Sequence, residues 1–202
     1  MRFIYAVLLL CTHLLWTSIA HASIVHKDWK VPGDHFVSFD QQTNLDWLKL
    51  SATTGKTLSY VTAHLGDEFY GWRLPTVTEV RTMAETRLGA ALLSPAFTSG
   101  SSVTLSTAQR QTWYEFMGIT HTSASFGYVE PSHISGIYGV GIFPGGSFTN
   151  ILYGETAKDG HAHTYFIGIY LVRDAVMDVN GPFAVGALAL LVIVSMMRRK
   201  HL

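Results

Sequence analysis

Two histidines separated by a single residue are the side chains in this sequence whose spacing best suits metal chemistry. His161 and His163 flank Ala162, so in a strand both imidazoles would face one side, as a two-histidine ligand pair requires. Asp159 and Gly160 precede them and indicate a junction between a loop and a strand. The spacing fixes no third ligand. We therefore expect exposed loop histidines and no bound metal or other cofactor, and His161 and His163 stay as weak metal candidates.

A short acidic motif, Glu130-Pro131-Ser132, resembles the Glu-Pro-Asn loop through which C-type lectins bind calcium and sugar. Serine replaces the asparagine here, and no Trp-Asn-Asp motif follows further along the chain. Calcium needs several converging oxygen ligands, and Glu130 is the one carboxylate clearly available in this region. We expect the motif to form a turn.

The residue types needed for hydrolysis do not form a catalytic pattern. The seven histidines between residues 23 and 178 are scattered, without a Gly-x-Ser-x-Gly motif or paired carboxylates at catalytic spacing. Cys11 is the only cysteine and lies in a segment that we expect to be removed, which excludes thiol chemistry and disulfides from the mature chain. We expect the protein not to be an enzyme; a metal-dependent hydrolase using His161 and His163 is the least supported alternative.

Aromatic side chains could instead offer a platform on which a sugar ring stacks. Trp47 and Trp72 lie in segments patterned with apolar partners, so we expect both in the core. The candidate ligand surface consists of four residues in a glycine-rich stretch: Tyr128, Glu130, Tyr138 and Phe143. The alternative, in which these aromatic rings only pack the loops, stays open.

The charge balance argues against nucleic acid as a partner. The chain has 14 basic and 14 acidic residues. Arg2, Arg198, Arg199 and Lys200 lie near the ends, which leaves ten basic against fourteen acidic residues between positions 23 and 178. A mildly acidic domain does not attract a phosphate backbone.

The sequence predicts two helices in the exported domain. Thr76 and Glu79 have the spacing of a capping box, and apolar residues at steps of three or four then predict an amphipathic helix over Val77–Leu88, closed by Gly89. A second helix is predicted over Thr57–Leu65, where threonine can cap a short apolar face. The bulky residues just before the capping box mark an abrupt strand-to-helix junction.

Strands are predicted on both sides of the helices. Alternating residues predict a hairpin from 35–40 and 45–50, and residues 103–106 and 111–116 have the composition of strands. Residues 165–172 form the strongest predicted strand, because they are almost continuously apolar and so expected to be buried on both faces.

The predicted fold class is α+β. Eight glycines between Gly118 and Gly154 indicate long loops between short strands. We expect one small, twisted, mostly antiparallel sheet that carries the two helices, with the glycine-rich loops on the side away from them.

The N-terminus has the layout of a secretory signal peptide. Arg2 precedes an apolar run over 3–15, and Ala20 and Ala22 supply the small residues that signal peptidase requires before a cleavage site after Ala22. The apolar run is short for a membrane-spanning helix.

The C-terminus predicts a membrane anchor. The sixteen residues from Pro182 to Met197 carry no charge and span about 24 Å as a helix, which suffices for a bilayer when flanking cations snorkel. Arg198, Arg199 and Lys200 follow at once and would stop the chain with its tail in the cytoplasm. The expected organisation is a signal peptide (1–22), a polar leading segment (23–35), an exported domain (36–174), a linker with sorting motif (175–181), a transmembrane helix (182–197) and a basic tail (198–202).

One stretch resembles a known module. Asp40 to Leu48, the Thr-Thr-Gly at 53–55 and the Gly-Trp-Arg-Leu-Pro-Thr at 71–76 are similar to the WRLPT-bearing domain of unknown function of the Lcl C-terminal type, found in exported bacterial proteins. The Leu-Val-Arg at 171–173 matches the strand with which that pattern ends. The resemblance covers roughly residues 36–173 and implies a C-type-lectin-like fold.

The C-terminus resembles the PEP-CTERM sorting signal that exosortases process. Here the motif reads Val179-Asn180-Gly181-Pro182, without the glutamate of Pro-Glu-Pro. The resemblance implies a protein that is exported, held in the inner membrane by this helix, and then cut and released or attached at the cell surface. Its partners would be signal peptidase, an exosortase-like enzyme and extracellular polysaccharide.

We therefore expect a surface-displayed, non-enzymatic module of a bacterial envelope that binds glycan or another matrix component. The main alternative is a permanently anchored single-pass membrane protein with an adhesive or structural role.

Overall fold

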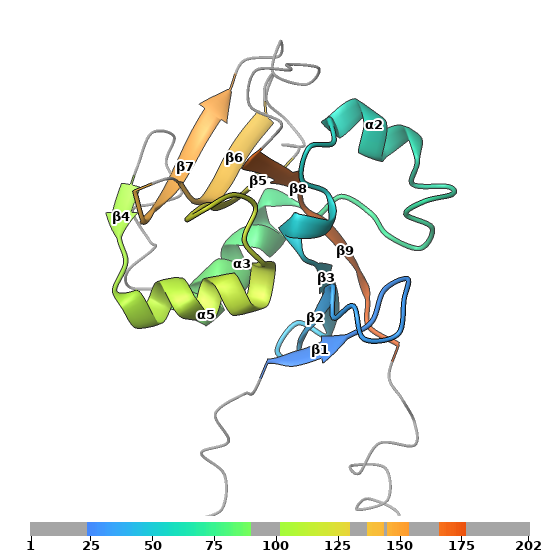
Figure 1. Ribbon diagram of the computed structural model, residues 1–202, viewed down its shortest axis with the longest axis horizontal. Helices are drawn as coiled ribbons and strands as arrows, with labels where there is room; N and C mark the ends of the chain where they lie inside the picture. The colour runs from blue at the N-terminus through green and yellow to red at the C-terminus, as the bar shows by residue number, and fades with distance from the viewer. Residues whose placement is uncertain (1–23, 90–101, 130–136, 144, 154–165, 177–202) are drawn as a thin grey trace, which may run out of the picture.

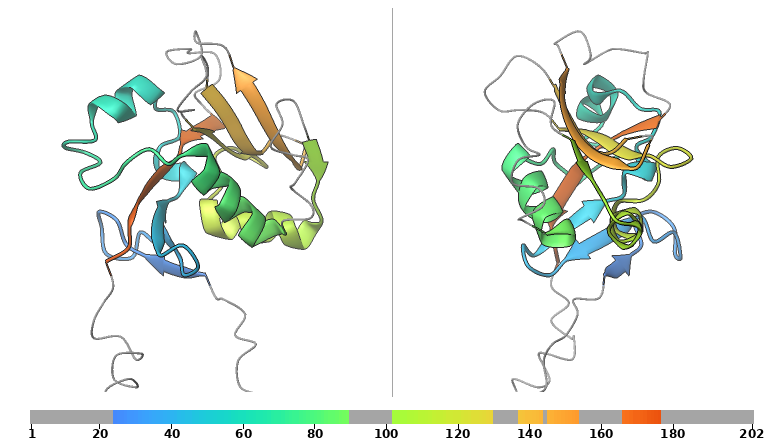
Figure 2. Two further views of the ribbon diagram at one scale, coloured as in Figure 1. Left: turned by 180° about the vertical axis from the view of Figure 1, so that it is seen from behind. Right: turned by 90° about the vertical axis from the view of Figure 1, so that its left-hand side faces the viewer.

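The computed structural model describes residues 24–89, 102–129, 137–143, 145–153 and 166–176. These residues form an α+β fold with mostly antiparallel strands, as the sequence predicts. The strands belong to two sheets, however, and not to the single sheet expected. Figures 1 and 2 show α3 and α5 lying side by side, with α2 set apart from them.

The first sheet is antiparallel throughout and has the order β1-β2-β3-β9. Its strands are β1 (Val25–Lys27), β2 (Val37–Asp40), β3 (Leu45–Leu48) and β9 (Leu171–Asp174). The predicted hairpin is confirmed as β2 and β3. The first strand lies within the leading segment at 23–35, so part of that segment belongs to the sheet.

The start of β1 and the end of β9 lie at the same end of this sheet. Val25 pairs with Phe39, near the end of β2, and Asp174 pairs with Leu45, at the start of β3. The β2–β3 turn therefore lies beside the beginning of β1 and the end of β9, and the amide of Ala175 donates to the carbonyl of the turn residue Asn44 at 3.1 Å. In Figure 1 the chain enters and leaves the fold on the same side.

The second sheet has the order β4-β7-β6-β5-β8 and contains one parallel pair, β5 with β8. Its strands are β4 (Ser102–Thr104), β5 (Ser125–Val129), β6 (Ile137–Ile142), β7 (Ser147–Tyr153) and β8 (Ile167–Ile169). Residues 118–154 were expected to form short strands joined by long loops; the described part of that segment contains the strands β5, β6 and β7.

Glycine occurs in these strands where a side chain would not fit. A Cβ on Gly127 would collide with the Leu50 side chain and stand 2.8 Å from the Tyr170 ring. A Cβ on Gly168 would likewise collide with the backbone carbonyl of Leu50 in the 3₁₀ helix η1 (Leu50–Ala52). Glycine here therefore permits close packing between the sheet and η1, and does not mark a loop.

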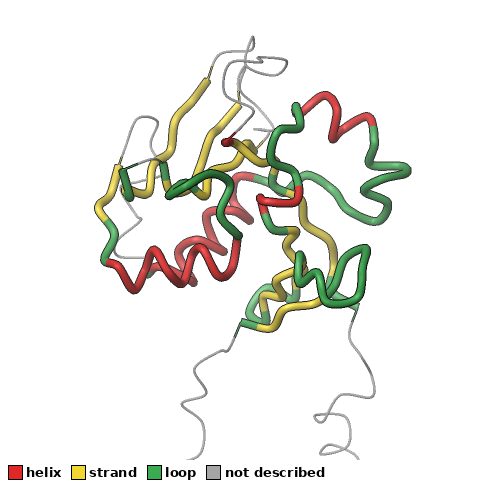
Figure 3. The backbone as a smooth tube through the Cα atoms, in the orientation of Figure 1, coloured by secondary structure: helices red, strands yellow, loops and turns green. Residues whose placement is uncertain are grey.

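The two predicted helices are present. Helix α2 (Leu58–Ala63) is capped by Thr57, whose hydroxyl accepts from the Tyr60 amide, but it ends at His64 and not at Gly66. Helix α3 (Val77–Leu88) begins with the predicted capping box and ends at Gly89, which has φ +102°. Figure 3 shows the long loop that joins the two helices.

A third helix, α5 (Thr107–Met117), replaces the strand predicted at 111–116. Ser106 and Gln109 form a second capping box at its start. Trp113, Phe116 and Met117 are then buried at steps of three and four, so burial of one helical face outweighs the strand preference of the aromatic residues.

The apolar run at 165–172 forms two short strands in different sheets, and not one. The hydroxyl of Thr53 binds both polar backbone groups of Ile169, accepting from its N–H at 2.7 Å and donating to its carbonyl at 2.9 Å. Tyr170 separates β8 from β9 and lies between the sheets, fully buried as expected. The chain thus leaves one sheet and enters the other within a few residues.

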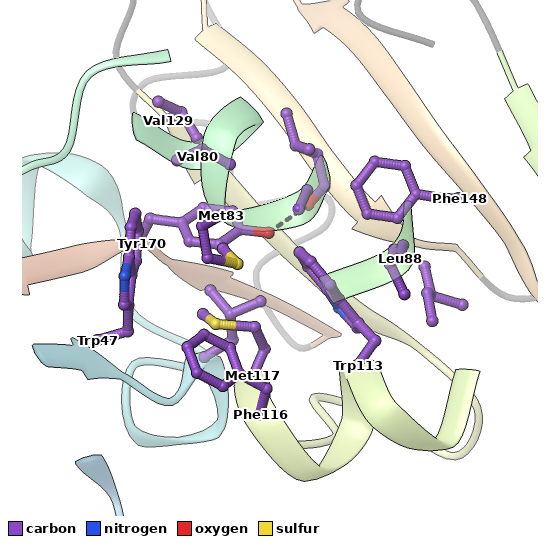
Figure 4. Packing of buried hydrophobic residues seen from close by; sticks show 14 of the residues in the cluster. Trp47, Val80, Met83, Leu88, Trp113, Phe116, Met117, Val129, Phe148 and Tyr170 are labelled. Atoms are coloured by element: carbon purple, nitrogen blue, oxygen red, sulfur yellow. Dashed lines mark hydrogen bonds between the residues drawn. The ribbon is translucent and has the colours of Figure 1, made fainter. Parts of the chain in front are cut away.

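The core follows from this arrangement. Trp47 of β3 meets the edge of Tyr170, their ring centroids 6.4 Å apart, and the Tyr170 hydroxyl donates to the Val140 carbonyl at 3.1 Å (Figure 4). On the other side of this cluster, the Trp113 ring of α5 packs edge-on against Phe148 of β7 at 5.1 Å. The expectation that Trp47 and Trp72 are core residues is confirmed, because they are 0% and 4% exposed. The helices α3 and α5 therefore pack against the glycine-rich strands, and not on the side away from them.

The predicted signal peptide, sorting motif, transmembrane helix and basic tail lie outside the described residues. Within the described ranges, the structure contains no helix that is both long enough and apolar enough to cross a membrane.

Candidate functional site

A polar cleft of about 440 Å³ lies where the β2–β3 turn meets α3 and α5. We call it the Arg87 cleft. Ile24, directly before β1, and Thr112 of α5 contribute to its edge. Its other lining residues carry carboxylate, amide, hydroxyl or guanidinium groups: Asp40, Gln41, Gln42, Thr86, Arg87 and Glu115.

The floor of the cleft is a buried ion pair. Arg87 Nη2 lies 3.0 Å from Asp40 Oδ1, and the two side chains are 8% and 0% exposed. The guanidinium also stacks on Phe116, with 4.3 Å between its central carbon and the ring centroid. Such a pair is expensive to desolvate, so its partners must hold it in fixed geometry.

The turn supplies those partners. The second carboxylate oxygen of Asp40 accepts from the Thr43 hydroxyl at 2.8 Å, and Oδ1 accepts from the Gln42 amide at 3.2 Å. The Thr86 hydroxyl donates to the Gln42 side-chain oxygen at 3.1 Å, which ties the turn to α3. Arg87 Nε is buried and has no partner among the described atoms. The cleft floor is thus rigid but not fully satisfied.

Helix α5 adds a carboxylate at the rim. Glu115 is exposed and accepts from the Gln111 side chain at 2.9 Å. Asp40 is paired with Arg87, so the exposed carboxylate of the cleft is that of Glu115. Its charge also acts on Lys49 and His26, and amide and hydroxyl groups lie beside it. This combination can accept and donate hydrogen bonds to the hydroxyl groups of a polar ligand.

One pair near the cleft has the residue types of a hydrolase. The Ser38 hydroxyl lies 3.2 Å from His26 Nδ1. However, Ser38 is fully buried and donates its proton to the Phe116 carbonyl at 2.6 Å. Burial and the nearby Lys49 charge lower the pKa of His26. The serine proton is thus committed to the backbone, and the pair joins β2 to α5.

A second group of polar and aromatic side chains surrounds Glu68, beside α2. Lys30 Nζ lies 4.0 Å from the centre of the Trp29 ring and 3.1 Å from Glu68. The Tyr60 hydroxyl donates to the same carboxylate at 2.9 Å. Tyr70 is 80% exposed. We call this group the α2 surface; Lys30 and Lys56 both pair with Glu68 there, so it is the weaker candidate.

The residues of the predicted ligand surface do not form one exposed surface among the residues that the structure describes. Tyr128 is 5% exposed, so it is a core residue and the expectation of an exposed ring was wrong. Phe143 is half-buried and packs edge-on against Phe126 and Phe166, at 5.4 and 5.9 Å between centroids. Tyr138 lies in β6, opposite Val129.

The remaining predicted residues lie outside the described ranges: Glu130, His161, His163, Val179, Asn180, Gly181, Pro182, Arg198, Arg199 and Lys200. Among the described residues, no three histidine, cysteine or acidic side chains come together as a metal site.

The sequence prediction missed the cleft itself. Asp40 and Arg87 are 47 positions apart, and Glu115 lies further along the chain, so no local spacing links them. The available indication was Arg87 on the helix that carries the buried Ala84 and Leu88, where a cation close to the apolar face requires a partner.

Comparisons of the chain with protein-family models, curated proteins and solved structures find no match.

Proposed function

We propose that this protein is an exported, non-enzymatic binding module of a bacterial envelope, which holds a hydroxyl-rich glycan or matrix component in the Arg87 cleft. The observation that carries the proposal is the cleft lining of amides, hydroxyls and one exposed carboxylate over a buried ion pair. Such groups match sugar hydroxyls, which both donate and accept hydrogen bonds.

We further propose a C-type-lectin-like fold for the domain. The resemblance that suggests it spans residues 36–173, and the mixed α+β arrangement with antiparallel strands is compatible with it. The segments that carry the resemblance form the β2–β3 turn with β3, the turn after η1, the loop that leads into α3, and most of β9.

The route to the surface is also proposed. Signal peptidase would remove residues 1–22, and the apolar segment 182–197 would hold the precursor in the inner membrane with Arg198, Arg199 and Lys200 inside. An exosortase-like enzyme would then act at residues 179–182 to release the domain or attach it at the surface.

A permanently anchored adhesion or structural protein is the second candidate. The absence of glutamate from Val179-Asn180-Gly181-Pro182 favours it, because the motif then lacks part of the processing pattern. The intact mass of the native product separates the two candidates: a mass that still includes Leu202 supports the anchored form.

Glycan-array screening of the full chain in mild detergent tests the binding site. Gln42→Ala and Glu115→Ala change exposed cleft residues. Glu115→Ala should weaken binding at least about tenfold, because a hydrogen bond to a charged group is worth about 1.5–3 kcal/mol, and Gln42→Ala should weaken it about two- to tenfold, because a neutral hydrogen bond is worth about 0.5–1.5 kcal/mol. Tyr70→Ala on the α2 surface is the matched control. Unchanged binding by both cleft variants, with loss in Tyr70→Ala, would place the ligand on the α2 surface instead.

A further inference from the structure

The position of the cleft relative to the chain ends carries a further inference. The β2–β3 turn lies at the end of the first sheet where β1 begins and β9 ends. Gln41 and Gln42 of that turn and Ile24 line the Arg87 cleft. The cleft therefore lies at the end of the domain from which the chain leaves toward its C-terminus. In Figure 2 β1 and the end of β9 lie at that same end.

The length of chain beyond this end is short. Val176 is the last described residue, and the uncharged segment begins at Pro182. Six residue steps span at most about 20 Å when fully extended. A domain of this size is roughly 40 Å across. With the segment 182–197 in a membrane, the end that contains the cleft must face the bilayer surface.

Exposed apolar side chains occur at the same end. Val176 is 83% exposed, and Val25 at the start of β1 is 37% exposed. They flank the β2–β3 turn from β9 and from β1. These side chains suit the boundary between protein and lipid headgroups better than open water.

We propose that the Arg87 cleft binds a saccharide at the surface of the membrane that holds the chain, as the headgroup of a glycolipid. The inference rests on the proposed function, since it needs the C-terminal segment in the membrane. Among the described residues, the cleft lining contains no aromatic ring for a sugar to stack on. We therefore expect the cleft to bind a single free sugar weakly. When the site and the glycolipid lie on one membrane surface, the effective concentration of the sugar rises to about the millimolar range, which compensates for the weak binding.

The orientation is tested by fluorescence quenching in the full chain. Cys11→Ser removes the single natural cysteine, and a dye is then attached at Gln41→Cys, beside the cleft, or at Thr62→Cys, an exposed position in α2. Helix α2 follows the opposite end of β3, so it serves as the distant control. In vesicles with nitroxide-labelled headgroups, quenching at position 41 should be several-fold stronger than at position 62.

Two outcomes overturn different claims. Equal quenching at both positions, or stronger quenching at position 62, in a chain that sediments with membranes overturns the inference alone. A chain that does not sediment with membranes overturns the proposed function and the inference with it.

The ligand is tested with the same dye at position 41. Phosphatidylcholine vesicles that contain digalactosyldiacylglycerol should shift its emission, and Glu115→Ala should abolish the shift while Tyr70→Ala leaves it unchanged. Free digalactose at the same bulk concentration should give no shift. An equal shift with the free sugar, or no shift with the glycolipid, would contradict a membrane-presented ligand.

Discussion

Replacing Glu79 by glutamine should destabilise the fold at neutral pH but not in acid. The Glu79 carboxylate accepts hydrogen bonds from Arg73 Nη1 at 3.0 Å, from Arg73 Nη2 at 2.6 Å and from the backbone amide of Thr76 at 2.8 Å. Arg73 is itself bonded through its backbone to Val172 of β9, at 2.9 Å in both directions. The Glu79 carboxylate therefore joins the start of α3 to the first sheet. Glutamine can keep the capping contact but loses the charge.

The pKa of the Glu79 carboxylate sets the size of the stability loss expected in Glu79→Gln. Hydrogen bonds from Arg73, opposed by partial burial, lower the pKa of Glu79 from its usual 4.5 to about 2. A difference of this size corresponds to about 3.4 kcal/mol at 1.36 kcal/mol per pKa unit. However, the Glu79 and Arg73 side chains are 25% and 46% exposed, so water screens their attraction. We expect about 1 kcal/mol in practice.

The sign of the pH dependence is fixed because folding lowers the pKa. The stabilisation is complete above pH 4.5, where the unfolded chain is also ionised, and is lost as the pH falls toward about 2. Urea unfolding of the full chain in mild detergent, followed by tryptophan fluorescence, measures it in native and Glu79→Gln protein. Glu85→Gln, in the exposed i,i+4 pair of the same helix, is the control and should cost less than about 0.5 kcal/mol. A Glu79→Gln loss of equal size at pH 7 and pH 2 would refute the charge-based explanation.

Three further changes probe the core and the cleft. Trp72→Ala should cost about 3–5 kcal/mol, because the side chain is 4% exposed; an unchanged melting temperature would contradict its core assignment. Gly127→Ala should cost about 1–3 kcal/mol through overpacking against a buried tyrosine ring 2.8 Å away, whereas Gly66→Ala, which faces open space, should cost far less by the same thermal melt. Arg87→Met should cost about 3–5 kcal/mol in urea unfolding by stranding the buried Asp40 charge, and adding Asp40→Asn should recover part of that loss.

Local sequence patterns predicted the parts of the fold that local chemistry determines. The threonine caps of α2 and α3 occur where their spacing placed them, since a cap is made by residues three positions apart. The same logic applies to Ser106 and Gln109, but the aromatic residues behind them favoured a strand prediction. Which preference prevailed depended on burial against other elements, and no short window of sequence contains that information.

Long-range contacts determined what the sequence prediction missed. At the break between β8 and β9, the Thr53 hydroxyl binds the backbone groups of Ile169, 116 positions away along the chain. Gly127 appeared to mark a loop, yet in the structure it permits close packing against η1, as Gly168 of the predicted strand also does. The candidate cleft has the same origin, because α3 must reach the β2–β3 turn before Arg87 and Asp40 can meet.

The departure of both chain ends on one side also determines how the domain would respond to mechanical force. Tension between a ligand held by the turn residues of the Arg87 cleft and the C-terminal segment would cross the β2–β3 turn and the end of β9, which share the bond from Ala175 to Asn44. The second sheet lies outside that path. Tension between the two termini would instead pull on β1 and β9, the edge strands, and open their hydrogen bonds one after another, as in a zipper. The domain should therefore withstand pulling through its ligand with little distortion of its core, but unravel early when pulled by its ends.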